Sequence, residues 1–146
     1  MGEKAKPDFI KTPADALMAV AAMAISVDGN MDDSEVQRLK AMAYMNPLYE
    51  DFASDELEEY IRSIAGKMPG LPYGETLNRC AETLPPHLKE TAYAWAVEMA
   101  AANGTLALAE DRMLHDLRAI FGITPAFSQA VDTAIMALLR NDRQAE

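Results

Sequence analysis

Apolar residues recur along this chain at the spacing of an α-helix, about every three or four positions. The segment from Asp55 to Lys67 shows the pattern clearly, because Leu57, Ile61 and Ile64 fall on one face of a helix. No segment shows sustained alternation of apolar and polar residues bounded by hairpin turns. The pattern therefore predicts an all-α fold without a sheet.

Seven helices are expected, and most of their ends carry recognisable signals. Thr12 precedes Pro13 as a predicted N-cap, and Asp32 and Glu35 have the spacing of a capping box. Ser54 is predicted to cap the third helix, and Asn103-Gly104 to end the fifth. The predicted helices span residues 13–27, 33–45, 55–67, 73–84, 85–102 and 108–121, and a seventh begins at Thr124-Pro125.

The apolar stripes of these helices predict the core. Trp95 is the largest apolar residue and is expected to be buried, and Cys80 is expected to be a buried core thiol. The predicted stripe of the fourth helix also includes Tyr73. The stripe of the seventh helix consists of Phe127, Ala130, Val131, Ala134, Ile135 and Leu138.

An internal repeat appears at an offset of 75 residues. Asp28-Gly29-Asn30-Met31 aligns with Asn103-Gly104-Thr105-Leu106, and Glu35 aligns with Glu110. Met42 and Met45 then correspond to Leu117 and Ile120. Each copy is predicted to consist of an Ala-rich helix, an Asp-Gly or Asn-Gly turn, an acidic residue six positions after the Gly, and an apolar helix. Two helix-loop-helix units, at about 13–46 and 86–122, are predicted to pack about a pseudo-twofold axis.

Composition agrees with one helical domain. The chain has 146 residues, 50% of them apolar, with 10 Met and only 7% aromatic residues. Small and flexible side chains suit closely packed helices better than sheets. We therefore expect residues 1–146 to form a single helical bundle of about seven helices.

The net charge of −10 narrows the range of partners. Nucleic-acid binding depends on Lys and Arg against phosphate, so a role on DNA or RNA is disfavoured. An acidic chain favours cations or a basic protein partner, and it is repelled by anionic membrane surfaces. The single cysteine excludes an internal disulfide and a multi-thiolate zinc site.

The apolar run 16–27, which follows Lys4, Lys6 and Lys11, superficially resembles a signal peptide. However, Thr12-Pro13 marks a helix start, and a similar Ala-rich run recurs inside the chain at 92–102. The run is also far shorter than the roughly 20 residues that cross a bilayer. The sequence therefore predicts a soluble, cytoplasmic protein without membrane insertion.

Candidate chemistry is concentrated in one acidic loop. Asp28, Asn30 and Asp32 alternate, and Glu35 follows. Oxygen ligands at every second position suit Ca²⁺ or Mg²⁺, although the loop is not an EF-hand, because Asp33 and Leu39 stand where Gly and Glu are needed. Helix ends and capping explain most of the same residues. Both interpretations, a divalent-cation site and a purely structural motif, stay open at this point.

The loop and its surroundings resemble the TerB-like family, which is associated with tellurite resistance and related stress responses. The resemblance is strongest over 19–39, with SVDGNMDDSE at its centre, and it covers roughly 14–139. It implies a bundle of seven to eight helices with two repeats, acidic residues that bind a divalent cation, and no catalytic activity. The second segment, MAAANGTLALAE, fits more loosely because Asn103 and Ala107 replace acids, so a second cation site at 103–110 is not expected.

Other residues give weaker indications. His87 and His115 each share a helix face with one acid, whereas a zinc site needs three or four ligands. No nucleophile elbow or phosphate-binding Gly loop is present, so the chain is not expected to be an enzyme. The acidic run from Glu50 to Glu59 is either a solvated face or a docking surface for a basic partner. Two hypotheses follow: a cation-binding module of metal or oxyanion stress response, and a protein-interaction module with a structural acidic motif.

Overall fold

The computed structural model describes residues 6–25, 31–102 and 111–139, and every regular element in these ranges is a helix. The predicted all-α single domain with seven α-helices is confirmed over this part of the chain, while the internal repeat stays a prediction. Two short 3₁₀ helices were not predicted. The elements are η1 (Pro7–Phe9), α1 (Pro13–Ile25), α2 (Asp33–Tyr44), η2 (Pro47–Tyr49), α3 (Ser54–Lys67), α4 (Tyr73–Thr83), α5 (Pro86–Ala102), α6 (Arg112–Phe121) and α7 (Pro125–Leu138).

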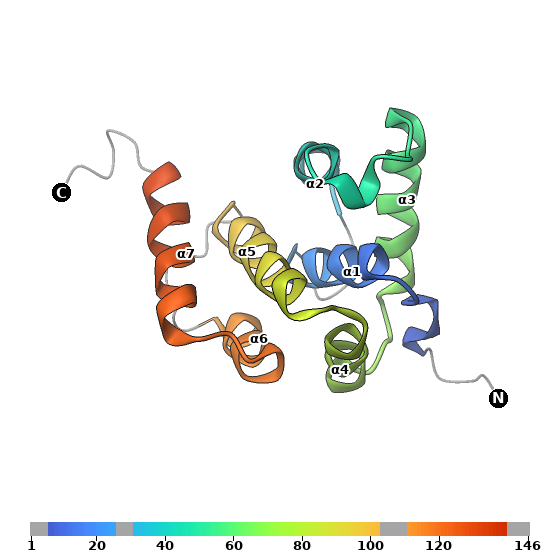
Figure 1. Cartoon of the computed structure of the whole chain (residues 1–146). Helices are drawn as coiled ribbons and strands as arrows, with labels where there is room; N and C mark the ends of the chain where they lie inside the picture. Colours follow the sequence, from blue (N-terminus) through green and yellow to red (C-terminus); the bar gives the residue numbers. More distant parts are fainter. Residues whose placement is uncertain (1–5, 26–30, 103–110, 140–146) are drawn as a thin grey trace.

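The Ala-rich helices α1 and α5 pack against each other at the centre of the molecule (Figure 1). Every residue from Ala16 to Ala22 is buried, and most of the C-terminal half of α5 is buried as well. A helix that is apolar on nearly all sides has to be covered on all sides. The small side chains of α1 and α5 let the two backbones approach, and the other helices then surround the pair.

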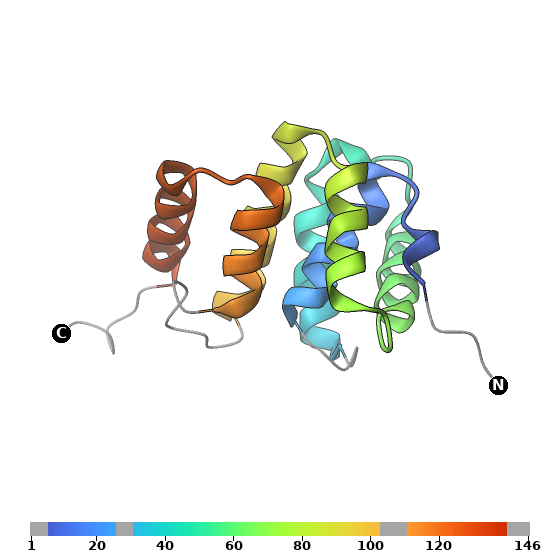
Figure 2. The same cartoon turned by 90° about the horizontal axis from the view of Figure 1, so that it is seen from below.

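The other five α-helices lie around this central pair and differ in which helices they pack against. In Figure 1, α4 and α6 lie below the central pair. In Figure 2, which is seen from below, they lie side by side in front of that pair, and α3 and α7 lie at opposite flanks. α3 packs against both α1 and α2, whereas α7 packs mainly against α5. None of the described helices combines the length and apolar character that a membrane crossing needs.

Local capping signals predicted several helix starts correctly. The Thr12 hydroxyl accepts the Asp15 N–H at 3.1 Å, and the Thr124 hydroxyl accepts the Phe127 N–H at 3.1 Å. The prediction for Ser54 was wrong, since Ser54 is the first helical residue and Ala53 precedes it. The Glu56 carboxylate accepts the Ala53 N–H at 2.8 Å, and this bond places the cap one residue earlier.

Rings from three segments meet beneath η2. Tyr49 is only 2% exposed, and it stacks on Trp95 with ring centroids 6.0 Å apart. The Tyr49 hydroxyl donates to the Ala14 carbonyl at 2.7 Å, and the Tyr60 hydroxyl donates to the Asp15 carboxylate at 2.7 Å. Phe52 and Tyr60 add a pair at 4.8 Å. The predicted burial of Trp95 is confirmed, and this cluster ties the turn after α2 to the start of α1.

Some predicted stripe residues are not in the core. Tyr73 is exposed, and its hydroxyl donates to Asp116 at 2.8 Å, because a tyrosine can satisfy its polar end only at the surface or against a partner. Met45, the last residue of the predicted second helix, is instead the exposed C-cap of α2. On α7, Ala130, Ala134 and Leu138 are exposed, because α5 covers only one side of that helix.

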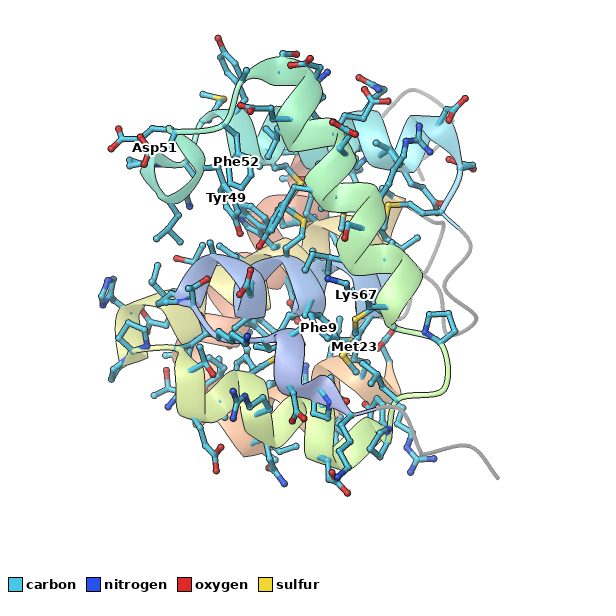
Figure 3. All side chains as sticks on the ribbon, turned by 90° about the vertical axis from the view of Figure 1, so that its right-hand side faces the viewer. Phe9, Met23, Tyr49, Asp51, Phe52 and Lys67 are labelled. Carbon is cyan, nitrogen blue, oxygen red and sulfur yellow. The ribbon has the colours of Figure 1, made fainter. Side chains whose placement is uncertain are left out.

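Polar contacts attach the outer elements to the centre. The buried Tyr93 of α5 donates to Asp132 of α7 at 3.0 Å and accepts a bond from Arg118 of α6 at 3.0 Å. At the opposite flank, the Lys67 ammonium lies 5.4 Å from the ring centre of Phe9, so η1 rests beside the end of α3 (Figure 3).

Candidate functional site

The start of α2 brings together two of the four predicted site residues. Asp32 is the N-cap, and its Oδ1 accepts the Glu35 N–H at 2.8 Å. In return, Oε1 of Glu35 accepts the Asp32 N–H at 2.9 Å, which completes a capping box. The Ser34 hydroxyl also donates to Oδ1 of Asp32 at 2.8 Å. The predicted capping role of Asp32 and Glu35 is therefore confirmed.

These hydrogen bonds also set the charge of the cap. The backbone N–H of Glu35, followed by the Ser34 hydroxyl, lowers the pKa of Asp32 below its ordinary value of 3.8. Asp32 is therefore a carboxylate at neutral pH. The adjacent Asp33 forms an ion pair with Arg62 of α3 at 2.8 Å. The guanidinium group of Arg62 therefore contacts Asp33 rather than the N-cap residue Asp32.

The other two predicted residues, Asp28 and Asn30, lie outside the described residues. The structure therefore places two of the four predicted cation ligands, Asp32 and Glu35. Across residues 6–25, 31–102 and 111–139, no group of three or more His, Cys, Asp or Glu side chains could hold a metal ion. Hard oxygen donors suit Ca²⁺ or Mg²⁺, but the Asp32 and Glu35 carboxylates supply only part of the six to eight oxygens that Ca²⁺ takes.

The residue that follows the second motif, Asp111, bears on the predicted start of the sixth helix. Asn103–Glu110 lies outside the described residues, and the predicted start of the sixth helix at 108 was wrong, because Asp111 is non-helical and α6 begins at Arg112. Asp111 is the N-cap, and its Oδ1 accepts the Leu114 N–H at 3.0 Å. The fixed offset of 75 residues instead places the cap at Ala107, which has no side-chain acceptor. Asp111 was missed for that reason.

The remaining reactive side chains lie apart from the start of α2. Cys80 is fully buried, and burial raises the pKa of its thiol to about 12, as expected for a core thiol rather than a nucleophile. His87 and His115 are exposed on α5 and α6. None of the three belongs to a ligand group in the described part of the chain.

A pocket of about 250 Å³ lies where the end of α1 meets the start of α6. Met23 (labelled in Figure 3) and Met113 give it an apolar lining, and the capping residue Asp111 also lines it. The pocket brings the segment preceding residues 26–30 close to the segment following residues 103–110. This proximity could not be read from the sequence, because it depends on how α1 crosses α5.

Comparison with known proteins gives one match. The model of a family described as tellurite resistance protein TerB matches residues 14–133, which is most of the chain and runs from the second residue of α1 into α7, whose last five residues lie beyond it. No curated protein and no solved structure matches the chain. The match confirms the resemblance carried by the acidic loop and its flanking helices. The chain thus belongs to the TerB family, the family of the tellurite resistance protein TerB.

Proposed function

We propose that this protein is a non-catalytic TerB module that binds a divalent cation at the start of α2 and acts in the response to tellurite or related metal and oxyanion stress. Family membership supports the stress-response role. The observation that carries the cation site is the pairing of Asp32 and Glu35, whose backbone and side-chain bonds hold two carboxylates within one helical turn.

The capping box at the start of α2 uses one oxygen of each carboxylate, which is compatible with cation binding by the other oxygen. The bonds described above engage Oδ1 of Asp32 and Oε1 of Glu35, and each carboxylate has a second oxygen. In the proposed site, Asp28 and Asn30 supply the further oxygens that the sequence rhythm predicts. Ca²⁺ and Mg²⁺ are the favoured cations, because all four residues offer hard oxygen donors.

Thermal unfolding with and without Ca²⁺, Mg²⁺, Mn²⁺ and Zn²⁺ tests this proposal. A cation that binds only the folded protein stabilises it by about 2.7 kcal/mol at 100 times its dissociation constant. Asp28→Asn should remove most of that gain while changing little in the absence of the cation, since Asn keeps an acceptor and tolerates a helix end. Asp8→Asn is the matched control, because it removes the same charge at an exposed position in η1.

A second candidate function is a protein-interaction module in which the acidic motif is only structural. The complete capping box favours it, because reciprocal bonds account for both Asp32 and Glu35 without a ligand. This candidate predicts no cation-dependent stabilisation. It also predicts that Asp32→Ala costs about 1 kcal/mol whether or not a cation is present. If calorimetry detects no binding of any of the four cations at millimolar concentration, the protein-interaction module is favoured over the cation site.

A further inference from the structure

The turn from α2 to α3 exposes two large apolar side chains side by side in the sequence. Tyr44, the last residue of α2, is 75% exposed, and Met45, its C-cap, is 86% exposed. Such exposure is unusual in this structure, since Tyr73 and Leu138 are the other large apolar residues classed as exposed among the described ones. Tyr and Met are enriched where proteins bind each other, because Tyr is rigid and amphipathic and Met adapts its shape.

Acidic residues follow Tyr44 and Met45 in the sequence after four uncharged positions, 46–49. Residues 41–60 contain six acids and no Lys, Arg or His. Glu58 is the one acid of the six that is neutralised, by Lys40 and Arg62, in the described part of the chain. The other five are exposed and form no ion pair there; they are Glu50, Asp51, Asp55, Glu56 and Glu59.

This surface is built on a fixed base. In Figure 3, Tyr49 and Phe52 point toward the body of the molecule, whereas Asp51 between them in the sequence points outward. Tyr49 is anchored by its bond to the Ala14 carbonyl and by its contact with Trp95. A rigid base means that a partner does not have to order the turn before binding it, which reduces the entropic cost of association.

We propose that Tyr44, Met45, Glu50, Asp51 and Asp55, which we term the corner surface, bind a basic segment of a partner protein. That segment presents one or two apolar side chains flanked by Lys or Arg. Its apolar side chains would cover Tyr44 and Met45, and its cations would face the unpaired carboxylates. A second copy of this chain is a poor occupant, because the net charge of −10 would bring like charges together. This inference does not rest on the proposed cation site.

Calorimetry with three synthetic peptides tests the charge and apolar parts of the proposal separately. The first peptide is a basic amphipathic helix with a Leu stripe between Lys and Arg residues. In the second peptide Glu replaces the cations, and in the third Ser replaces Leu. The parent protein should bind the first peptide at least tenfold more tightly than either of the others. Binding of the first peptide should weaken as salt is raised, because part of it is electrostatic.

Matched variants of the protein test whether the first peptide binds at the corner surface. Tyr44→Ser with Met45→Ser should weaken binding of the first peptide at least tenfold, and Glu50→Gln with Asp51→Asn should weaken it several-fold and reduce its salt dependence. The controls are Leu138→Ser, an equally exposed apolar residue on α7, and Asp8→Asn with Glu82→Gln, two exposed acids elsewhere. These controls should bind like the parent, and unfolding curves of all variants should overlay.

Three results would overturn the proposal: no binding of the first peptide, equal weakening by the control variants, or a self-association in sedimentation that Tyr44→Ser with Met45→Ser abolishes. The last result would assign the surface to a second copy of the chain. Asp28→Asn should bind the first peptide like the parent, so failure of the cation site and failure of the corner surface can be told apart.

Discussion

At the scale of single residues, Asp32 shows how one carboxylate is set by its neighbours. Hydrogen bonds from Glu35 and Ser34 favour its charged form and outweigh the lesser effect of desolvation, which favours the neutral form. Both donors are within three positions in the sequence. The capping box could therefore be predicted from spacing alone, whereas the contact of Arg62 with Asp33 depends on how α3 packs against α2 and could not.

The lowered pKa of Asp32 predicts a pH-dependent stability. Because the folded-state pKa lies below the ordinary 3.8, the unfolded chain takes up the proton first as the pH falls. The stabilisation is therefore fully present above the unfolded pKa and is lost as the pH falls through the folded pKa. Asp32→Asn keeps an acceptor but no charge, so urea unfolding in EDTA should find it less stable than the parent near neutral pH.

The same comparison in acid provides the check. The gap in unfolding midpoint between the parent and Asp32→Asn should narrow as the pH is lowered below about 4. A gap that stays constant across this range would show that the charge of Asp32 contributes nothing to the cap.

At the scale of elements, several helix starts could be predicted from local spacing, although the caps of α3 and α6 were not. Thr12, Asp32 and Thr124 cap their helices through bonds that span three residues, so local spacing identifies them. The stripe of α7 was only partly right, because an apolar face is buried only where another element covers it. Ala130 and Ala134 have the correct helical spacing but lie away from α5.

Asp111 gives a prediction for α6. Asp111→Ala removes the acceptor for the Leu114 N–H and should lower the free energy of unfolding by about 1 kcal/mol. Arg112→Ala, at the next position, is the control and should change stability by less than about 0.5 kcal/mol, because its long 3.9 Å contact with Asp116 is largely in solvent. Urea unfolding measures both, and equal losses would argue against the cap at Asp111.

At the scale of the whole molecule, burial is unequally distributed between the centre and the flanks. α1 and α5 supply the largest share of the buried side chains, whereas Ser128 is the one buried residue of α7. The candidate site was predictable only where it coincides with a cap. The corner surface and the pocket between α1 and α6 depend on the three-dimensional path of the chain and have no signature in local spacing.

Hydrogen exchange should report this unequal burial. Amides in α7 should exchange through local opening at a lower free energy than those in α1 and α5, because few buried contacts hold that helix. Asp132→Ala should lower the protection of α7 further, since it removes the carboxylate that accepts the Tyr93 hydroxyl hydrogen bond, while α1 is affected much less. If α7 proved as well protected as α5, the packing at that flank would be tighter than its burial indicates.

The pairing of α1 with α5 also has a consequence for how the protein is made. The two helices are separated by 60 residues of sequence, 26–85. At about 5–20 residues per second, a ribosome needs several seconds to add that length, while a helix can form in about a microsecond. During that interval α1, apolar on nearly all sides, lacks the helix that covers it. Nascent chains are therefore most exposed to aggregation and to chaperones before Ala102 has emerged.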